Sequence, residues 1–381
     1  MSDARPLRTL AIPRGPRALG VLPELAAAIA GEATWLPVPE ADPDRSALLA
    51  RTQRAGEPVA ADVAVVMCTS GSTGDPKGAL LTGANLAASA DATHARLGGP
   101  GRWLLATPAD HVAGLQVLLR SARAGYEPAA MDLAGGFRPQ ALADAIASMA
   151  GPRRYLSLVP MQLAAVLAGG GEAAAAAAAL AELDAVLVGG QAADPALVAR
   201  ARDAGIRCVT TYGSSETSGG CVYDGVPLDG ARVGLDDGRI VLSGPMVARG
   251  YRDPRPELAD GVFRTSDAGE IGADGRLRVL GRLDDIIISG GLKNHPGPVE
   301  EALLALPGVD AACAAGVPDE RLGQAIGALY VGSAEPDDVR RRAREALGAH
   351  RAPRRVMRVA QLPLLPSGKV DRRAAADMLD R

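Results

Sequence analysis

Short apolar runs that end in glycine, proline or hydroxyl residues recur through the first half of the chain. Their sequences are VAVVMCTSG, RWLLATP, YLSLVP, DAVLVGG and RCVTTYG. Alanine-rich stretches of helical character lie between them, at 113–124, 139–149, 161–168 and 194–204. Strands that alternate with helices predict an α/β fold, whose ligand sites lie at the carboxyl ends of the strands. We therefore expect the polar loops TSGSTG, VGGQ and YGSSET to converge on one ligand.

Past residue 225 the pattern changes to short strands and tight turns. Asp-Gly pairs at 237–238 and 274–275 predict hairpins. PVEEALLALPGV and 337–347 predict helices, AIGALYVG predicts a strand, and LPLLPSGKVDRRAA predicts a loop. We expect a large α/β domain at 1–283 and a small α+β domain at 284–381. The alanine run 173–179 is interpreted as a surface helix or loop without a function.

Length, charge and cysteine usage limit the class of protein. A chain of 381 residues is too long for one core of ordinary size, so two or three domains are expected. Its 41 basic and 44 acidic residues argue against a protein that binds nucleic acid or a membrane surface by charge. Four scattered cysteines indicate neither a disulfide framework nor a zinc site. Without a signal-like or membrane-spanning segment, we expect a soluble cytoplasmic protein with no membrane insertion.

The loop TSGSTGDPKG follows an apolar strand. A Walker-type phosphate loop requires GxxxxGK[ST], but here Lys77 precedes Gly78, so the order is inverted and a Walker-type NTPase is excluded. The composition still suits phosphate, because glycines allow close backbone approach, hydroxyls and N–H groups donate, and lysine supplies positive charge. The alternative is a plain Gly/Ser surface turn.

TSGSTGDPKG resembles the signature loop of the adenylate-forming superfamily, which includes acyl-CoA synthetases, adenylation domains and luciferases. The resemblance implies a large N-terminal domain, a mobile C-terminal domain, and the use of ATP, Mg²⁺ and a thiol acceptor. It also implies that one set of residues holds the β- and γ-phosphates: Thr69, Ser70, Gly71, Ser72, Thr73, Gly74 and Lys77.

Two further segments resemble the parts of this superfamily that bind adenine and the acyl group. TTYGSSETSGG resembles its YGxTE motif, which implies that Tyr212 stacks on adenine and that Glu216 ligates Mg²⁺. Gly213 and Ser214 would line the acyl site, and Ser215 replaces the usual threonine while keeping a hydroxyl. VGGQAA resembles the second glycine loop, which implies an adenine contact by Gly189, Gly190 and Gln191.

FRTSDAGEI resembles the superfamily's TGD motif, with Ser266 in place of glycine, and implies that Asp267 binds the ribose hydroxyls. LGRLDDIIISGGLK resembles GRxDDxIxxxGxK. It implies ribose contact by Arg282, a hinge at Asp284, and a path for the pantetheine arm at Gly290 and Gly291. A surface ion pair between Arg282 and Asp284 is the alternative.

LPSGKVDR resembles the superfamily's PxGKxxR motif, which implies that Lys369 is the catalytic lysine of the first half-reaction. An exposed lysine in a tail is the alternative. Pro298 stands where members commonly have glutamate, a departure that bears on the thioester-forming conformation.

The chain has 68 residues before Thr69, fewer than superfamily members usually have, so we expect a reduced first subdomain. Among short members, TPADHVAGLQVLLRSARAG and RRYLSLVPMQLAAVL resemble the 2-succinylbenzoate–CoA ligases of menaquinone biosynthesis. This resemblance implies that His111 forms part of the acyl pocket wall. Gln116 and Arg120 share a helix face, and Arg120 could bind a second substrate carboxylate. An exposed helix arginine is the equally weighted alternative.

The function expected from these resemblances is an AMP-forming acid–thiol ligase. It would convert a small-molecule carboxylate to acyl-AMP with release of pyrophosphate, and then transfer the acyl group to CoA. One alternative is an enzyme that loads the phosphopantetheine of a carrier protein, and another is a degenerate nucleotide-binding protein without activity. A homodimer is left open, since many relatives are dimers.

Overall fold

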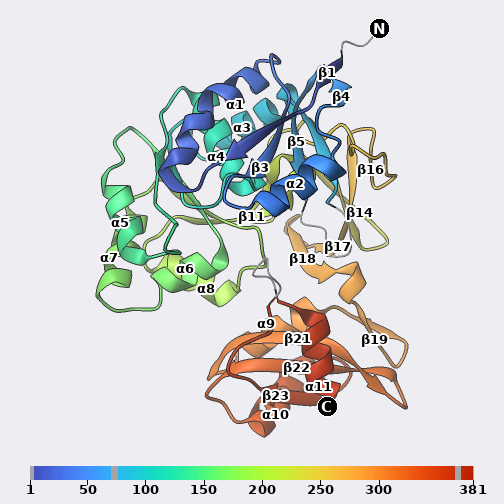
Figure 1. Ribbon diagram of the computed structural model, residues 1–381. Helices are drawn as coiled ribbons and strands as arrows, with labels where there is room; N and C mark the ends of the chain where they lie inside the picture. Colours follow the sequence, from blue (N-terminus) through green and yellow to red (C-terminus); the bar gives the residue numbers. More distant parts are fainter. Residues whose placement is uncertain (1–3, 70–75, 365–369, 381) are drawn as a thin grey trace. The chain divides into compact units, whose positions relative to one another are not determined.

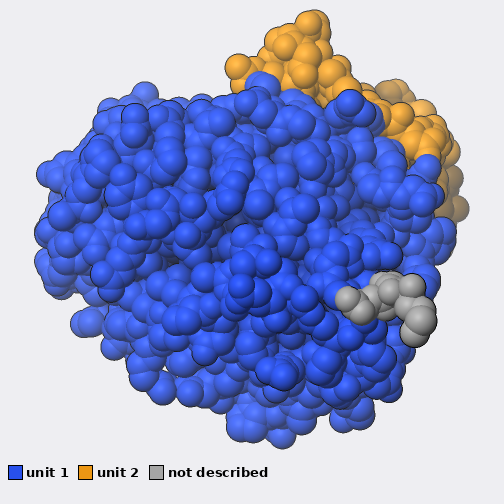
Figure 2. Space-filling view, turned by 90° about the horizontal axis from the view of Figure 1, so that it is seen from above, with its two compact units in different colours: residues 1–193, 197–234, 241–264 blue, residues 194–196, 235–240, 265–381 orange. Residues whose placement is uncertain are grey.

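The structure of the chain is a computed structural model that describes residues 4–69, 76–364 and 370–380. Two compact units make up the chain (Figure 1). Unit 1 comprises residues 1–193, 197–234 and 241–264, and unit 2 comprises residues 194–196, 235–240 and 265–381, as coloured in Figure 2. The domain boundary at 283/284 stays a prediction.

The largest sheet confirms the α/β class. Its seven strands have the order β13-β12-β11-β10-β9-β7-β8, with parallel pairing from β11 to β8 and antiparallel pairing from β11 to β13. The strands are β7 (Arg102–Leu105), β8 (Ala129–Ala130), β9 (Arg154–Leu158), β10 (Ala185–Val188), β11 (Cys208–Ser214), β12 (Gly219–Tyr223) and β13 (Val226–Pro227). The helices that occur between these strands in the chain are α4 (Val112–Ala124), α5 (Pro139–Ala147), α6 (Pro160–Val166), α7 (Gly171–Ala181) and α8 (Pro195–Asp203).

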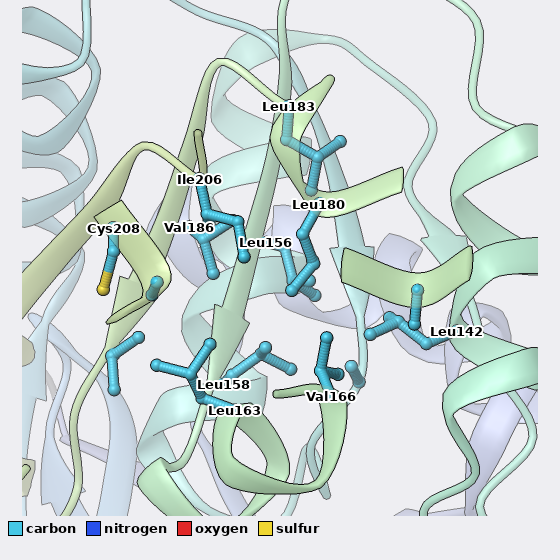
Figure 3. Packing of buried hydrophobic residues seen from close by; sticks show 14 of the residues in the cluster. Leu142, Leu156, Leu158, Leu163, Val166, Leu180, Leu183, Val186, Ile206 and Cys208 are labelled. Carbon is cyan, nitrogen blue, oxygen red and sulfur yellow. The ribbon is translucent and has the colours of Figure 1, made fainter. Parts of the chain in front are cut away.

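The core of this sheet is aliphatic. Strand residues such as Leu156 and Val186 pack with Leu163 of α6 and Leu180 of α7 (Figure 3). The alanine run forms helix α7, in which Ala173 and Ala176 are buried. Because alanine side chains are small, α7 can pack closely on α5 and α6. The alanine run is therefore a surface helix, as predicted, with one face packed on the core and Ala174, Ala175 and Ala178 exposed.

The N-terminal strands form two smaller sheets. Strands β2 (Arg8–Ile12), β3 (Trp35–Pro39), β5 (Val63–Cys68) and β6 (Gly78–Thr82) lie in that order, and only β5 and β6 are antiparallel. Strands β1 (Ala4–Pro6) and β4 (Pro58–Ala60) pair separately. The accompanying helices are η1 (Gly15–Val21), α1 (Leu22–Ile29), α2 (Pro43–Thr52) and α3 (Gly83–Arg96). Thr82 begins α3 with a reciprocal capping box to Asn85.

A further sheet has the order β14-β15-β17-β16, and β18 pairs with β17. Its strands are β14 (Arg232–Asp236), β15 (Arg239–Ser243), β16 (Leu258–Ala259), β17 (Val262–Ile271) and β18 (Leu277–Arg282). Both predicted Asp-Gly turns are confirmed, since they join β14 to β15 and β17 to β18.

Unit 2 contains a second sheet of order β20-β19-β22-β21, with β23 parallel to β22. Alternate residues of β21 face opposite sides: Cys313, Ala315 and Val317 pack with α11, and Ala314 packs in the cluster of α9 and α10. The elements are η3 (Leu283–Asp285), β19 (Ile287–Ser289), β20 (Leu292–Asn294), α9 (Pro296–Leu304), β21 (Val309–Asp319), β22 (Gly323–Gly332), α10 (Pro336–Leu347), β23 (Arg355–Arg358) and α11 (Arg372–Asp380).

One expectation for the C-terminus was wrong. The stretch DRRAA was predicted as part of a loop, but helix α11 begins at Arg372. Ala375 and Leu379 are buried against the sheet, and this four-residue spacing is the helical signal that the nearby Pro and Gly obscured. Over the described ranges, no single helix has the length and apolar character to cross a membrane, although the bent pair α6–α7 meets that criterion jointly.

Candidate active site

Strands β5 and β6 hold the two ends of the predicted phosphate loop. Cys68 pairs with Gly78, and the N–H of Thr69 donates to the carbonyl of Lys77 at 2.8 Å. A Cβ at Gly78 would lie 2.1 Å from Oε1 of Gln53 and 2.7 Å from Cγ1 of Val66, so any larger residue at this exit from the loop would require both side chains to move. The loop residues Ser70, Gly71, Ser72, Thr73 and Gly74 lie outside the described residues, and their phosphate contacts stay predictions.

Lys77 is held by residues that sequence reasoning missed. Its Nζ lies 2.8 Å from Oε1 of Glu257 and 5.4 Å from the ring centroid of Tyr251. Burial is the largest single influence on Glu257 and opposes its ionisation, but the hydrogen bonds from Lys77 and the backbone, together with the charges of Lys77 and Arg255, lower the pKa of the carboxyl group. Lys77 therefore has a carboxylate partner in this structure.

Glu216 lies in the short 3-10 helix η2 (Ser215–Thr217), directly after β11. Its side chain is buried, and its Oε1 accepts a 2.7 Å hydrogen bond from the hydroxyl of Tyr251, which is also buried. Burial and the negative charge of Glu216 both raise the pKa of Tyr251, which keeps the phenol protonated. Tyr251 thus contacts the predicted metal ligand with its hydroxyl and faces Lys77 with its ring.

The single carboxylate of Glu216 fits a magnesium site in which a bound nucleotide supplies further ligands. The described residues contain no cluster of three or more His, Cys, Asp or Glu side chains that could bind a metal ion by itself. Mg²⁺ in phosphoryl-transfer sites typically takes one or two carboxylates and completes its shell with phosphates and water. A single carboxylate therefore suffices here, and Glu216 is the residue that would hold the ion.

The end of β11 has a backbone that requires glycine. The strand shifts register between Tyr212 and Gly213, where φ is +157°, and a Cβ at Gly213 would lie 2.2 Å from the carbonyl oxygen of Gly219. After this bulge the N–H of Ser214 donates to Oγ1 of Thr217 at 2.9 Å. Oγ of Ser214 is buried and has no hydrogen-bond partner in the described part of the chain. A ligand could satisfy this hydroxyl, as the predicted acyl-site role requires.

The second glycine loop lies beside β11. Val188, the last residue of β10, pairs in parallel with Thr210, so the loop of Gly189, Gly190 and Gln191 follows at the same sheet edge as Tyr212. A Cβ at Gly189 would lie 2.1 Å from Oγ1 of Thr211. This glycine lets the two chain segments approach closely where adenine contact is predicted.

Helix α4 carries the residues predicted for the acyl pocket. His111 precedes the helix with its side chain 63% exposed, whereas the side chains of Gln116 and Arg120 are buried. The Nε2 group of Gln116 donates to the carbonyl of Ser218 at 2.6 Å, directly before β12. The structure therefore places the three residues in two environments, the exposed start of α4 and its buried face.

Arg120 is not the exposed helix arginine of the alternative interpretation, because it is only 3% exposed. Its guanidinium carbon lies 4.8 Å from the ring centroid of Trp103, and Nη2 is 3.4 Å from the hydroxyl of Tyr223. Burial lowers its pKa, and no described carboxylate forms an ion pair with it. A buried cation of this kind has an unmet electrostatic demand for an anion.

Unit 2 contains the predicted ribose residues. Asp267 of β17 pairs with Arg282 of β18, and its N–H donates to Oγ1 of Thr265 at 3.0 Å. Nη2 of Arg282 donates to Oδ2 of Asp284 at 2.7 Å. Burial acts against the charge of Arg282, but this hydrogen bond and the charges of Asp284, Asp267 and Asp285 together raise its pKa. The ion pair considered as the alternative therefore exists in the structure. Ribose binding by Asp267 and Arg282 and the hinge role of Asp284 stay predictions.

Gly290 and Gly291 form the turn between β19 and β20, with φ values of +59° and +80°. Such left-handed conformations favour glycine at both positions. Their place along a pantetheine path stays a prediction.

Lys369 lies outside the described residues, but the arginine of the same motif does not. Nε of Arg372 lies 3.2 Å from Oδ2 of Asp285, and the guanidinium forms a second ion pair with Glu300. Nη1 of Arg372 also donates to the carbonyl of Ala314 at 2.9 Å. These contacts fix the start of α11 on α9 and β21, directly after the segment with the predicted catalytic lysine.

Comparison with known proteins gives a consistent result. The family model of AMP-binding enzymes matches residues 18–252, and that of the AMP-binding enzyme C-terminal domain matches residues 298–369. A probable 2-succinylbenzoate–CoA ligase of Mycobacterium tuberculosis is 46% identical over 379 residues, 97% of each chain. The 2-succinylbenzoate–CoA ligase of Geobacillus kaustophilus is 34% identical over 82% of this chain and 68% of its own.

A solved structure shows the same fold. The o-succinylbenzoate–CoA synthetase of Bacillus subtilis, in complex with its acyl-adenylate intermediate, superposes with a TM-score of 0.79 at 23% identity. The superposition covers 97% of this chain and 88% of that one. With two family models matched in order and a relative similar over almost the whole chain, this chain belongs to the AMP-binding, adenylate-forming enzyme family.

Proposed function

We propose that this chain is an AMP-forming acid–CoA ligase that converts 2-succinylbenzoate to 2-succinylbenzoyl-CoA in menaquinone biosynthesis. The main support for this proposal is the 46% sequence identity, over 97% of both chains, to a probable 2-succinylbenzoate–CoA ligase. We also propose that the protein is located in the cytoplasm and forms a homodimer. Both statements rest on the family resemblance alone.

The chemistry follows from the weakness of a carboxylate as an electrophile. In the first half-reaction the substrate carboxylate attacks the α-phosphorus of ATP, an acyl–phosphate bond forms, and pyrophosphate leaves. In the second, the CoA thiol loses its proton and attacks the acyl carbonyl, and AMP leaves. Mg²⁺ bound at Glu216 would neutralise the phosphate charge that develops in the first step.

The protein's own groups have separable tasks in this scheme. Lys77 and the loop before it would bind the departing phosphates, and Lys369 would contribute a compact positive charge at the reacting centre. Gly189, Gly190, Gln191 and Tyr212 would bind adenine. Asp267 and Arg282 would bind ribose when the C-terminal domain closes, as the resemblance implies.

Arg120 supports the choice of acid. The substrate 2-succinylbenzoate has an aromatic carboxylate in addition to the succinyl carboxylate that is activated. A buried guanidinium without a described carboxylate partner is the group expected to bind that second anion. His111 and Ser214 would complete the wall of the acyl pocket.

The test is incubation of the purified protein with ATP, Mg²⁺, CoA and 2-succinylbenzoate, followed by mass spectrometry for the thioester. The proposal expects 2-succinylbenzoyl-CoA and AMP from the wild-type protein. It also expects a Lys369→Ala variant that binds ATP but forms no acyl-adenylate. If the acyl-adenylate forms but no thioester appears, CoA is not the acceptor and a carrier protein takes its place. If no acyl-adenylate forms, 2-succinylbenzoate is not the substrate.

A further inference from the structure

The segment from Pro245 to Arg252 links two motifs that are distant in the chain. On one side, the N–H of Ala248 donates to the carbonyl of Glu216 at 2.8 Å. On the other side, the N–H of Leu80 in β6 donates to the carbonyl of Gly250 at 2.8 Å, and Tyr251 forms a β-bridge with Ala79. The backbone at Tyr251 is thus fixed both to the 3-10 helix that carries Glu216 and to the strand that follows the phosphate loop.

The side chain of Tyr251 continues this connection. It is 4% exposed, and its hydroxyl donates to Oε1 of Glu216, which is 6% exposed. A buried carboxylate oxygen loses much of its hydration, so a 2.7 Å hydrogen bond from a phenol strongly restricts the carboxylate's orientation.

Only one oxygen of Glu216 is used in this way. Within the described ranges, Oε2 makes no hydrogen bond and no ion pair, and it is the oxygen that remains for an external ligand. Partners that orient a metal-binding side chain through its other atom are a general requirement of metal sites, and their removal typically weakens metal binding or activity about 10- to 100-fold.

We propose that Tyr251 is a positioning residue for the magnesium site: its hydroxyl fixes Oε1 of Glu216 so that Oε2 is presented to the metal. The proposal rests on the proposed function, since it takes Glu216 as the ligand of nucleotide-bound Mg²⁺. Tyr251 makes no contact with the substrate in this account and acts only through Glu216.

The experiment measures the affinity of Mn²⁺, as a paramagnetic substitute for Mg²⁺, for the full chain with saturating ATP and without acid or CoA. Tyr251→Phe removes only the hydroxyl. We expect its Mn²⁺ dissociation constant, measured by electron paramagnetic resonance, to rise about 10- to 100-fold. Tyr155→Phe is the matched control: Tyr155 is also buried, its hydroxyl donates to the carbonyls of Leu97 and Gly99, and it should bind Mn²⁺ as the wild type does.

A double-mutant cycle distinguishes an effect that acts through Glu216 from a general folding defect of Tyr251→Phe, which would weaken Mn²⁺ binding in both backgrounds. In Glu216→Gln the metal-binding charge is absent, so adding Tyr251→Phe should not weaken Mn²⁺ binding further. Wild-type affinity in the folded Tyr251→Phe variant, or an additional loss in the double variant, would overturn the proposal. Because no acid is present, a wild-type protein inactive towards 2-succinylbenzoate would refute the proposed substrate and leave this measurement unaffected.

Discussion

Nζ of Lys77 lies 2.8 Å from Oε1 of Glu257, although 180 residues separate the two in the chain. Each side chain is about one-third exposed, at 33% and 31%. Exposed ion pairs contribute about 0.2–1 kcal/mol, so this one can be exchanged for a stronger anion. If Lys77 binds the phosphates of ATP, Glu257 competes with ATP for the same ammonium group.

We therefore predict that Glu257→Gln strengthens ATP binding. Removal of the competing carboxylate should lower the ATP dissociation constant about two- to fivefold, the equivalent of about 0.4–1 kcal/mol. Isothermal titration calorimetry at low ionic strength measures this effect, which added salt should reduce.

The control for this prediction is Asp253→Asn. Asp253 lies on the same segment and forms an ion pair with Arg54 at 2.7 Å, away from Lys77, so its loss should leave ATP affinity unchanged. Weaker ATP binding by Glu257→Gln would show instead that Glu257 holds Lys77 in the position that the nucleotide needs.

Arg120→Met should separate recognition of the acid from stability. Replacing a buried charge without an acidic partner by an apolar side chain of similar length is expected to leave the free energy of unfolding unchanged or to increase it. Loss of a charge-assisted contact should raise KM for 2-succinylbenzoate at least tenfold, the equivalent of about 1.4 kcal/mol, while KM for ATP stays the same.

Steady-state kinetics with both substrates, together with denaturant unfolding, test this prediction. Arg123→Met serves as the comparison, because Arg123 lies on the same helix but is exposed and paired with Asp91. An unchanged KM for 2-succinylbenzoate in Arg120→Met would assign the second carboxylate to another residue.

Local patterns were sufficient to predict most elements around the site. The apolar runs VAVVMC, AVLV and CVTTYG lie in strands β5, β10 and β11. The predicted loops TSGSTG and VGGQ lie at the ends of β5 and β10, whereas the predicted loop YGSSET begins inside β11, which extends to Ser214. Parallel pairing of β10 with β11 brings two of these loops to one edge, as the alternation of strands and helices predicted.

Long-range contacts were not predictable in the same way. Tyr251 and Glu257 occur in RGYRDPRPE, a stretch with neither strand alternation nor helical periodicity, and nothing in the spacing shows that it lies against Glu216 and Lys77. The burial of Arg120 depends on Trp103 from β7 and Tyr223 from β12, which only the folded sheet brings together. Such contacts arise from the packing of sheets and helices. Helix periodicity alone could not decide whether Arg120 is buried or exposed.

Gly213→Ala should destabilise the chain strongly. The new Cβ would lie 2.2 Å from the carbonyl oxygen of Gly219, so the bulge at the end of β11 would have to open. We expect a loss of about 2–4 kcal/mol from the combined backbone strain and overpacking, measured by denaturant unfolding. Gly125→Ala is the control: φ is +71° there but no atom lies within 4 Å, so about 1 kcal/mol is expected. Equal losses in the two variants would mean that β11 tolerates the side chain.

His94 should make the protein less stable in mild acid. It is buried on α3, and its Nε2 accepts a 3.2 Å hydrogen bond from Nε1 of Trp103. Burial, assisted by the charge of Arg120, lowers its pKa to about 4 from 6.5. Below pH 6.5 the unfolded chain binds a proton that the folded chain does not, so stability is full above 6.5 and falls towards pH 4. The predicted loss is about 3 kcal/mol over that window.

Unfolding curves between pH 7 and 4 provide the measurement, and His94→Gln removes the titrating group. The variant should start from a lower stability at pH 7, because Gln cannot reproduce the imidazole packing, but its stability should fall less steeply with acid than that of the wild type. His111→Gln is the matched control, since that side chain is 63% exposed and its loss should leave the wild-type slope unchanged. Parallel pH profiles for wild type and His94→Gln would show that the acid sensitivity comes from other groups, the ion-paired carboxylates first among them.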